Sequence, residues 1–438
     1  MPLRLDARAP GFDDAFQKFL RARDQEGQNV DAVVADIIAD VRARGDAAIV
    51  DYTKRFDRLT LAASGLRIDA AELDAAAARA DAKAVAALQF AAARIEAYHK
   101  RLLPAGFEFE DVQGVKLGAR WTPLDAVGLY VPGGTAAYPS SVLMNAVPAK
   151  VAGVARIVMV VPTPDGKLND LVLAAARLAG VTEIYRIGGA QAVAALAYGT
   201  ATIAKVDKIV GPGNAYVASA KKQVFGAVGI DLIAGPSEIL VVSDKRSDPA
   251  WIAADLLSQA EHDVASQSIL ITDDAAFADK VDAAVSAHLK SLPRAAIAAQ
   301  SWRDHGAIVV VASLDAAVPL IDRLAPEHLE LCVDAPERLA AKVRHAGAIF
   351  LGRHTPEAIG DYVAGPNHVL PTSQSARFSS GLGVLDFMKR TSLVSCDPKS
   401  LAAIGPAAVT LAEHEGLGAH ALSVSIRLGG GAAVRNKS

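Results

Sequence analysis

The stretch RIVMVVPTPDGKLNDLVLAAARLAGVTEIYRIG (156–188) holds two short runs rich in β-branched residues, with a helical run between them. The two runs have the length of buried strands, and LVLAAARLAG between them is typical of a helix. Because such a crossover returns the chain to the same edge of a sheet, we expect the two strands to pair in parallel. The stretch therefore predicts an α/β fold.

The same alternation continues on both sides of this stretch. Further strand-like runs are AVGLYV (126–131), KIVG (208–211) and IDLIAG (230–235), and later EILVVSD, SQSILITD, AIVVVAS, LELCVD and AIFLG within 238–352. We predict two Rossmann-like parallel-sheet domains with helical N-terminal and C-terminal extensions. One domain occupies 130–236, and the other is formed by 237–381 together with the helical segment 25–129.

The two ends of the chain carry helical patterns. Residues 29–56 repeat apolar side chains at intervals of three and four, with Asn29 as a possible cap, and residues 70–102 are alanine-rich. Residues 1–24 are predicted to be an N-terminal extension, and 382–438 a helical tail. Because so short a tail buries too little surface to stand alone, it should dock on its own body or on a second copy of the chain.

Composition narrows the classes of partner. The length of 438 residues suggests two or more domains, and the net charge of -3 gives no electrostatic reason to expect nucleic acid or an anionic membrane as partner. Without an apolar leader or a membrane-length apolar run, the predicted location is cytoplasmic. Two cysteines, Cys332 and Cys396, cannot form a disulfide framework and are predicted to be reduced.

Glycine-containing turns follow several strand-like runs. IVGPGNAYV, LIAGPSEIL and YVAGPNHVL place Asn214, Ser237 and His368 just past predicted strand ends, where open α/β sheets bind ligands. The turns in VPGGTAAYPSS and RIGGAQAVAA could hold a diphosphate on backbone N–H groups. No GxGxxG is present, so the pattern alone indicates a dinucleotide only weakly, and simple turn formation remains open for each.

Potential metal ligands are spread along the chain. In SDPAWIAADLLSQAEHD (247–263), Gln259 and His262 are three residues apart and should share a helix face. Asp361 could add an oxygen ligand, and His420 lies in an apolar tail helix where burial would require a partner. Two imidazoles, a carboxylate and an amide oxygen suit zinc or a similar divalent ion. Each residue could equally be a cap or a surface group, and spacing cannot show that they converge.

Glu327 and His328 stand side by side in LAPEHLELCV (324–333), where the flanking pattern favours apolar side chains. Pro326 ends the preceding helix, so both residues should lie at its exit before a strand. Histidine titrates near neutral pH and suits proton abstraction, while a neighbouring carboxylate can activate water. A solvated helix-to-strand corner is the structural alternative.

The combination of LLSQAEHD, LAPEHLEL, GDYVAGPNHVLPT and ARFSSGLGVLDFMKR with the histidine of the tail resembles the L-histidinol dehydrogenase family over essentially the whole chain. The resemblance implies the acid–base pair Glu327 and His328, and the zinc ligands Gln259, His262, Asp361 and His420. It implies that the substrate contacts are Ser237, Gln259, His262, His328, Asp361, Glu415 and His420. The NAD contacts that it implies are Tyr130, Gln191 and Asn214.

The family's activity is the oxidation of L-histidinol to L-histidine through L-histidinaldehyde, with two NAD and one zinc per subunit, in the final steps of histidine biosynthesis. Members of the family are homodimers, so the resemblance implies that Glu415 and His420 complete the partner subunit's site. Three rival functions stay open: a zinc dehydrogenase acting on another polar alcohol, a zinc hydrolase with Glu327 as base, and a non-catalytic metal-binding protein. The hydrolase is disfavoured because HExxH is absent.

Overall fold

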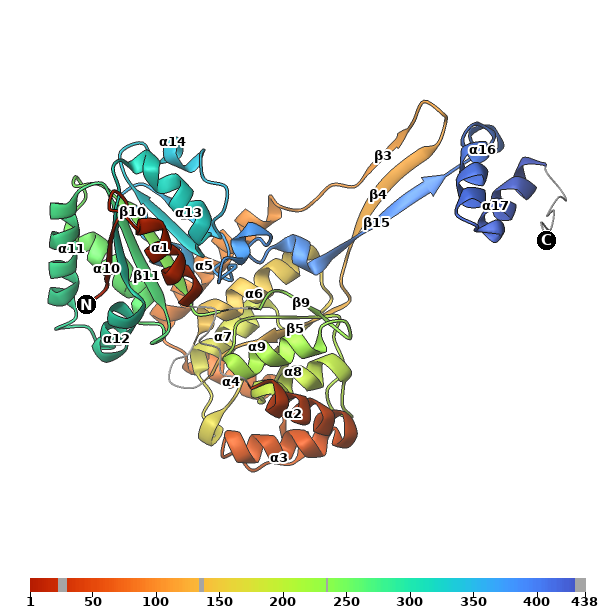
Figure 1. Cartoon of the computed structure of the whole chain (residues 1–438). Helices are drawn as coiled ribbons and strands as arrows, with labels where there is room; N and C mark the ends of the chain where they lie inside the picture. Colours follow the sequence, from red (N-terminus) through yellow and green to blue (C-terminus); the bar gives the residue numbers. More distant parts are fainter. Residues whose placement is uncertain (23–29, 134–137, 234, 430–438) are drawn as a thin grey trace. The chain divides into compact units, whose positions relative to one another are not determined.

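The computed structural model describes residues 1–22, 30–133, 138–233 and 235–429. The chain divides into two compact units, the first formed by 1–102 and 124–387 and the second by 103–123 and 388–438. The first unit contains two sheets of six strands each, and the second contains a sheet of three strands (Figure 1). Asn29, the predicted helix cap, lies outside the described residues.

One sheet of the first unit, sheet A, has the strand order β1-β12-β11-β10-β13-β14, and all of its strand pairs are parallel. Its strands, in sheet order, are Leu3–Asp6, Ala307–Val310, Gln267–Thr272, Glu238–Ser243, His328–Cys332 and Ala348–Leu351. Every residue of β10, β11 and β13 is buried, as expected for parallel strands that are covered on both faces.

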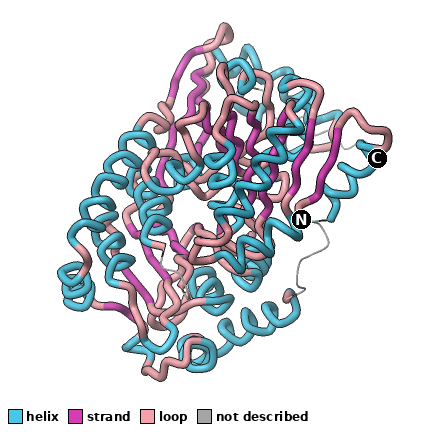
Figure 2. Tube along the Cα trace, turned by 90° about the vertical axis from the view of Figure 1, so that its left-hand side faces the viewer, coloured by secondary structure: helices cyan, strands magenta, loops and turns pink. Residues whose placement is uncertain are grey.

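Helices cover both faces of sheet A. On one face, α1 (Phe12–Ala22), α13 (Val318–Leu324) and α14 (Pro336–Ala340) pack on the strands, and on the other lie α10 (Pro249–Ala260), α11 (Ala275–His288) and α12 (Ala295–His305). Figure 2 shows strands with helices on either side of them. The predicted N-terminal extension is thus not only helical, because β1 forms the edge of sheet A.

Sheet B has the order β2-β7-β6-β5-β8-β9. In sheet order its strands are Arg67–Ile68, Glu183–Tyr185, Arg156–Val160, Ala126–Tyr130, Lys208–Val210 and Gly229–Ile230. All of its pairs are parallel except that of β2 with β7. The stretch quoted first forms β6, α7 (Asp170–Ala179) and β7, and the two strands pair in parallel as predicted.

Helices α2 (Asp31–Arg44) and α3 (Asp46–Phe56) share a core with α8 (Gly189–Tyr198) and α9 (Ala215–Val224) on sheet B. Gly45, with φ +57°, separates the first two helices, where the sequence suggested one continuous run. The rest of sheet B's helices are α4 (Ala70–Arg79), α5 (Ala82–Lys100) and α6 (Pro139–Ala152). The structure therefore differs from the predicted division, which grouped residues 25–129 with sheet A, because Val34, Ile37 and Val41 bury their apolar face against sheet B.

The second unit consists of an antiparallel sheet and two main helices. Strands β3 (Phe107–Glu110), β4 (Lys116–Pro123) and β15 (Met388–Ser395) form the sheet, followed by α16 (Pro398–His414) and α17 (Gly418–Ser425). The tail, predicted as residues 382–438, thus contains a strand where the sequence predicted only helices. Because β15 is exposed along nearly its whole length, it lacks the apolar pattern that marks buried strands.

The fold prediction is confirmed in class, because two parallel α/β sheets carry most of the chain. Both cysteines are free, with Cys332 buried in β13 and Cys396 exposed. Among the helices of the described ranges, none is both long and apolar enough to cross a membrane.

Candidate functional site

The candidate catalytic pair lies at the amino-terminal edge of sheet A. His328 is the first residue of β13 and Glu327 directly precedes it, while the neighbouring strand β10 begins at Glu238. The chain enters β13 through Ala325, whose φ of 44° is unusual for a residue with a side chain. This turn after α13 ends the helix and delivers both side chains to the strand's start.

His328 is 3% exposed, and a hydrogen bond fixes its ring. Its Nδ1 lies 2.8 Å from the backbone carbonyl oxygen of Glu238. Because a carbonyl oxygen only accepts, Nδ1 carries the proton, and Nε2 keeps its lone pair while the ring is neutral. Nε2 is buried, has no hydrogen-bond partner in the described structure, and lies 3.5 Å from Oε1 of Glu357.

Glu327 is also buried, and its Oε2 accepts a hydrogen bond of 2.8 Å from the backbone N–H of Glu238. The same oxygen lies 3.6 Å from Nδ1 of His328. Burial raises the pKa of Glu327 well above its usual range, and the nearby carboxyls of Glu238 and Asp361 raise it further. A carboxyl of this kind accepts protons more readily than an exposed one.

Gln259 lies in the last turn of α10 and His262 just beyond it, where the chain has returned to the same edge of the sheet after β10. The helix therefore does not carry both residues on one face, as the sequence predicted. Gln259 is 1% exposed, and both atoms of its amide lack a hydrogen-bond partner in the part of the chain that is described. A buried amide with neither end satisfied is rare and indicates a missing ligand. His262 follows the helix and donates its backbone N–H to the carbonyl of Gln259 at 3.2 Å.

His262 as a whole residue is exposed, yet its ring lies close enough to Glu357 and His328 for their charges to act on it. Loss of hydration lowers its pKa, partly offset by the charge of Glu357, and His328 lowers it further. The ring is therefore neutral at neutral pH, which is the form that binds metals.

Asp361 lies in α15 (Glu357–Tyr362), so a helix, and not the strand-like run that the sequence indicated, precedes the turn that carries His368. Burial raises the pKa of Asp361 well above its usual range, and the charge of Glu357 and a hydrogen bond between the two carboxyls raise it further. His368 donates from Nδ1 to the carbonyl oxygen of Asp361 at 3.1 Å, and its Nε2 lies 3.3 Å from the hydroxyl of Ser141. Burial lowers the pKa of His368 to about 4.

These side chains fit a divalent cation. One ligand atom from each of His328, Glu357 and Asp361 lies within 4.8 Å of the others, and the unsatisfied amide of Gln259 is buried. The set contains imidazole nitrogens, carboxylate oxygens and an amide oxygen, which suits zinc. Two further residues of the cluster, Glu238 and Glu357, were not identified from the sequence. Glu357 stands four residues before Asp361, a spacing that places both on one helix face.

Ser237 immediately precedes β10 and is partly buried. The sequence placed it past the carboxyl end of a strand, whereas the structure puts it at the amino-terminal end of β10, because the preceding strand β9 ends at Ile230 in the other sheet. Its carbonyl oxygen accepts from the backbone N–H of Gln267 at 2.9 Å. Ser237 therefore lies directly beside Glu238, at the same edge as His328.

The three predicted NAD contacts lie at the carboxyl-terminal edge of sheet B. Tyr130 ends β5, Gln191 lies in the first turn of α8, and Asn214 caps α9 after β8. Strand order reverses between β5 and β8, and such a switch point is where open α/β sheets bind ligands. The hydroxyl of Tyr130 accepts the backbone N–H of Gly189 at 3.0 Å, and burial raises its pKa to about 12. Part of the turn VPGGTAAYPSS, residues 134–137, lies outside the described residues.

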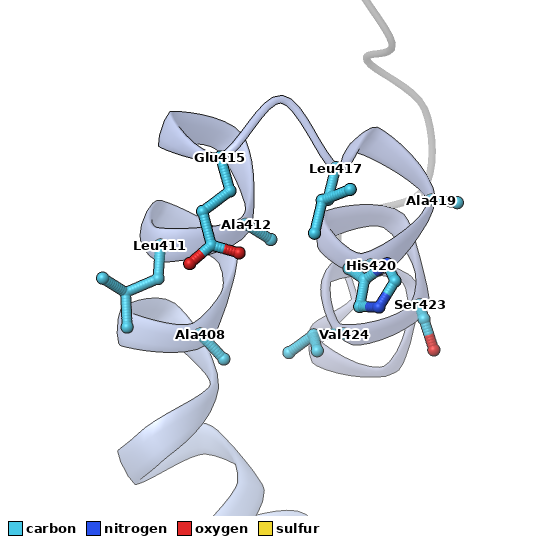
Figure 3. A pocket seen from close by; sticks show the side chains of 9 residues that line it. All are labelled: Ala408, Leu411, Ala412, Glu415, Leu417, Ala419, His420, Ser423 and Val424. Atoms are coloured by element: carbon cyan, nitrogen blue, oxygen red, sulfur yellow. The ribbon is translucent and has the colours of Figure 1, made fainter. Parts of the chain in front are cut away.

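Glu415 and His420 belong to the second unit, in which α16 and α17 form a helical hairpin. Both residues are exposed and line a groove of about 570 Å³ between the two helices (Figure 3). The rest of the lining is mainly aliphatic, including Leu411, Leu417 and Val424. Their roles as substrate contact and zinc ligand stay predictions.

Comparisons with known proteins agree over nearly the whole chain. The model of the histidinol dehydrogenase family matches residues 20–428. A histidinol dehydrogenase of Rhodospirillum rubrum is 66% identical over 98% of this chain and 100% of its own length, and one of Bradyrhizobium diazoefficiens is 63% identical over 98% and 99%. The crystal structure of histidinol dehydrogenase from Elizabethkingia anophelis superposes with a TM-score of 0.93 at 36% identity, covering 98% of each chain. The chain described here belongs to the histidinol dehydrogenase family.

Proposed function

We propose that this chain is a cytoplasmic homodimeric enzyme that oxidises L-histidinol to L-histidine through L-histidinaldehyde, with one zinc ion per subunit and two NAD. At the coarser level, the chain is an oxidoreductase of histidine biosynthesis that acts on histidinol. The finer proposal depends chiefly on one observation. The unsatisfied amide of Gln259, Nε2 of His328 and Oε1 of Glu357 are all buried polar atoms without partners among the described residues.

Gln259, His262 and Asp361 would hold the zinc ion together with the partner subunit's His420. Zinc would bind the imidazole and the amine of the substrate and so fix the carbinol carbon beside the base. Support comes from the neutral imidazole of His262 and from the carboxyl of Asp361, which burial makes costly to ionise unless a cation is near.

His328 would serve as the general base of both oxidations. With Nδ1 held by the carbonyl of Glu238, Nε2 is free to take the hydroxyl proton of the alcohol as hydride leaves its carbon for NAD. The same nitrogen would take a hydroxyl proton from the hydrated aldehyde in the second oxidation. Between the two steps the ring must release its proton.

Glu327 would take a proton from the water that hydrates the aldehyde. Its raised pKa favours this role, and the hydrogen bond from the backbone of Glu238 fixes the orientation of its carboxyl. The buried side chains of Glu327 and His328 would limit the access of bulk water to the aldehyde. Ser237, beside Glu238, is proposed as a substrate contact.

Tyr130, Gln191 and Asn214 would bind NAD at the switch point of sheet B. Gln191 is 2% exposed, and the side chain of Asn214 caps α9 by accepting from the backbone N–H groups of Tyr216 and Val217. The free N–H groups at the start of such helices suit a diphosphate. Glu415 of the partner subunit would contact the substrate.

The stoichiometry of the reaction tests the proposal. Purified, zinc-loaded protein is given L-histidinol and excess NAD, and the NADH formed is counted against the histidinol consumed. Two NADH per histidinol are expected, with histidine as product. One NADH per histidinol, with free aldehyde accumulating, would contradict the four-electron reaction, and equal turnover after zinc removal would contradict the metal requirement. Small hydroxylated or sulfonated alcohols serve as competing substrates, and none should exceed histidinol in kcat/KM.

A further inference from the structure

Glu357 is the buried residue at this site to which neither the sequence nor the proposed reaction assigns a role. It begins α15 and is 2% exposed. Its backbone N–H donates to Oε1 of Glu330 at 2.5 Å, and its Oε2 accepts from the hydroxyl of Ser258 at 3.2 Å. These two hydrogen bonds, one from the backbone and one to the side chain of Glu357, hold its carboxyl facing the site.

The remaining oxygen, Oε1, lies 3.5 Å from Nε2 of His328. The carboxyl also contacts that of Asp361, one turn later on the same helix. The three side chains bring one ligand atom each within 4.8 Å of one another. Glu357 therefore touches both the proposed base and a proposed zinc ligand.

Two further carboxyls, those of Glu330 and Asp255, support Glu357. Glu330, from the middle of β13, accepts the backbone N–H of Glu357 and hydrogen-bonds to Asp255 of α10. The hydroxyl of Ser258, also on α10, donates to Glu357 as well as to the carbonyl oxygen of Asp255. Helix α10 also carries Gln259. Buried contacts thus join the three elements that supply Gln259, His328 and Asp361.

We propose that Glu357 is a positioning residue, which orients the carboxyl of Asp361 for zinc and stabilises the imidazolium that forms when His328 takes a proton. The inference rests on the proposed zinc site. Residues behind metal ligands commonly fix ligand orientation, and their loss typically lowers metal affinity about 10- to 100-fold. A residue with only a structural role would change the stability of the apo-protein and leave metal affinity unaltered.

The test compares Glu357→Gln with the parent and with Glu337→Gln, a matched change at an exposed position of α14. Zinc affinity is measured on the metal-free full chain by competition with a chromophoric chelator, and the thermal midpoint is measured on the same samples. We expect Glu357→Gln to weaken zinc binding about 10- to 100-fold, with a midpoint close to that of the parent. The Glu337 variant should match the parent in both.

Zinc binding by Glu357→Gln within twofold of the parent overturns the inference while leaving the proposed function intact. Failure of the parent itself to bind zinc overturns both. Should Glu357→Gln not fold, Ser258→Ala takes its place, because it removes the hydroxyl that holds Oε2. Weaker zinc binding by that variant supports the inference, and parental affinity overturns it. Reloading Glu357→Gln at saturating zinc should restore metal content but not the full kcat, since His328 also loses its neighbour.

Discussion

Nδ1 of His328 lies 2.8 Å from the carbonyl oxygen of Glu238, so two adjacent parallel strands fix the tautomer of the proposed base. The bond joins the first residue of β13 to the first residue of β10. Since the strands of a parallel sheet hold their registers rigidly, the lone pair of Nε2 is directed before any substrate binds. Because the sheet itself fixes the ring, the loss of activity in a His328 variant can be assigned to the loss of the base.

Replacing His328 with Ala should slow both oxidations by about 10²- to 10⁴-fold, because each requires a base at the same place. The measurement is kcat for supplied L-histidinol and, separately, for supplied L-histidinaldehyde. His354→Ala is the control, since His354 is exposed and lies beyond the carboxyl end of β14, at the opposite edge of the sheet. A variant that loses only the first oxidation would show that another group serves as base for the second.

Glu327→Gln should slow oxidation of supplied aldehyde more than oxidation of the alcohol to the aldehyde. Glutamine keeps the size of the side chain but cannot take a proton from water, and the loss should be about 10²-fold or more in the aldehyde reaction. Single-turnover kinetics with each substrate separate the two steps. Normal aldehyde oxidation combined with failure on the alcohol would reverse the assigned role.

His420→Ala should lose zinc, and a mixed dimer can show which subunit His420 serves. His420→Ala and His328→Ala chains are co-expressed with different tags, and the mixed dimer is purified through both. If each tail completes the partner's site, one site of the mixed dimer is intact, and about half of the parent activity per dimer returns. If each tail serves its own subunit, every site carries one substitution and the mixed dimer is as inactive as either parent variant.

Much of the fold could be predicted because its strands are buried on both faces. The runs that form β10, β11 and β13 are apolar throughout, and the helices between them leave only parallel pairing. The pattern fails where burial is one-sided or absent. The pattern did not identify β15, because that strand is exposed. It also could not show that α2 packs on sheet B, because an apolar helix face could pack equally well on either sheet.

The residues of the site could be named only through resemblance to a family. The sequence placed Gln259 in a helix, which is confirmed, but it also placed His262 on that helix and His328 just before a strand. In the structure His262 lies beyond the end of α10, and His328 is the first residue of β13. The sequence pattern could not show that α10, β13 and α15 meet at one edge of the sheet, because their meeting depends on the order of the strands. Glu357 escaped notice since an acidic residue in the first turn of a helix is ordinary, and only its burial beside Asp361 sets it apart.

Lys221→Met should destabilise the chain and weaken NAD binding. The side chains of Lys221 and Asp231 are 3% and 2% exposed and form an ion pair, and both also bind the backbone of Gly211, at 3.0 Å and 2.8 Å. Gly211, with φ +111°, begins the turn that leads to Asn214. Removing one partner of a buried pair leaves the other charge uncompensated, which costs about 3–5 kcal/mol. Urea unfolding and the KM for NAD are the measurements.

The control for that variant is Lys222→Met, which removes an exposed lysine from the same helix. It should leave both the free energy of unfolding and the KM for NAD close to the parent's. A loss of stability in Lys221→Met without any change in KM would mean that the ion pair supports the sheet but does not position the turn before Asn214.

Asp255, which is partly buried, and the fully buried Glu330 should make stability fall as pH rises. Burial raises the pKa of Asp255 from its usual 3.8 to about 6, and burial raises that of Glu330 well above its usual range. A carboxyl that is harder to ionise in the folded chain than in the unfolded chain favours folding below the unfolded pKa. That contribution is lost as pH rises from about 4 to about 6.

Asp255→Asn cannot ionise, so its free energy of unfolding should fall less over this interval than the parent's. Urea unfolding of zinc-loaded protein at several pH values measures the two slopes, with Asp273→Asn, an exposed site, as control. Equal slopes in Asp255→Asn and the parent would show that Asp255 ionises as freely in the folded chain as in the unfolded one.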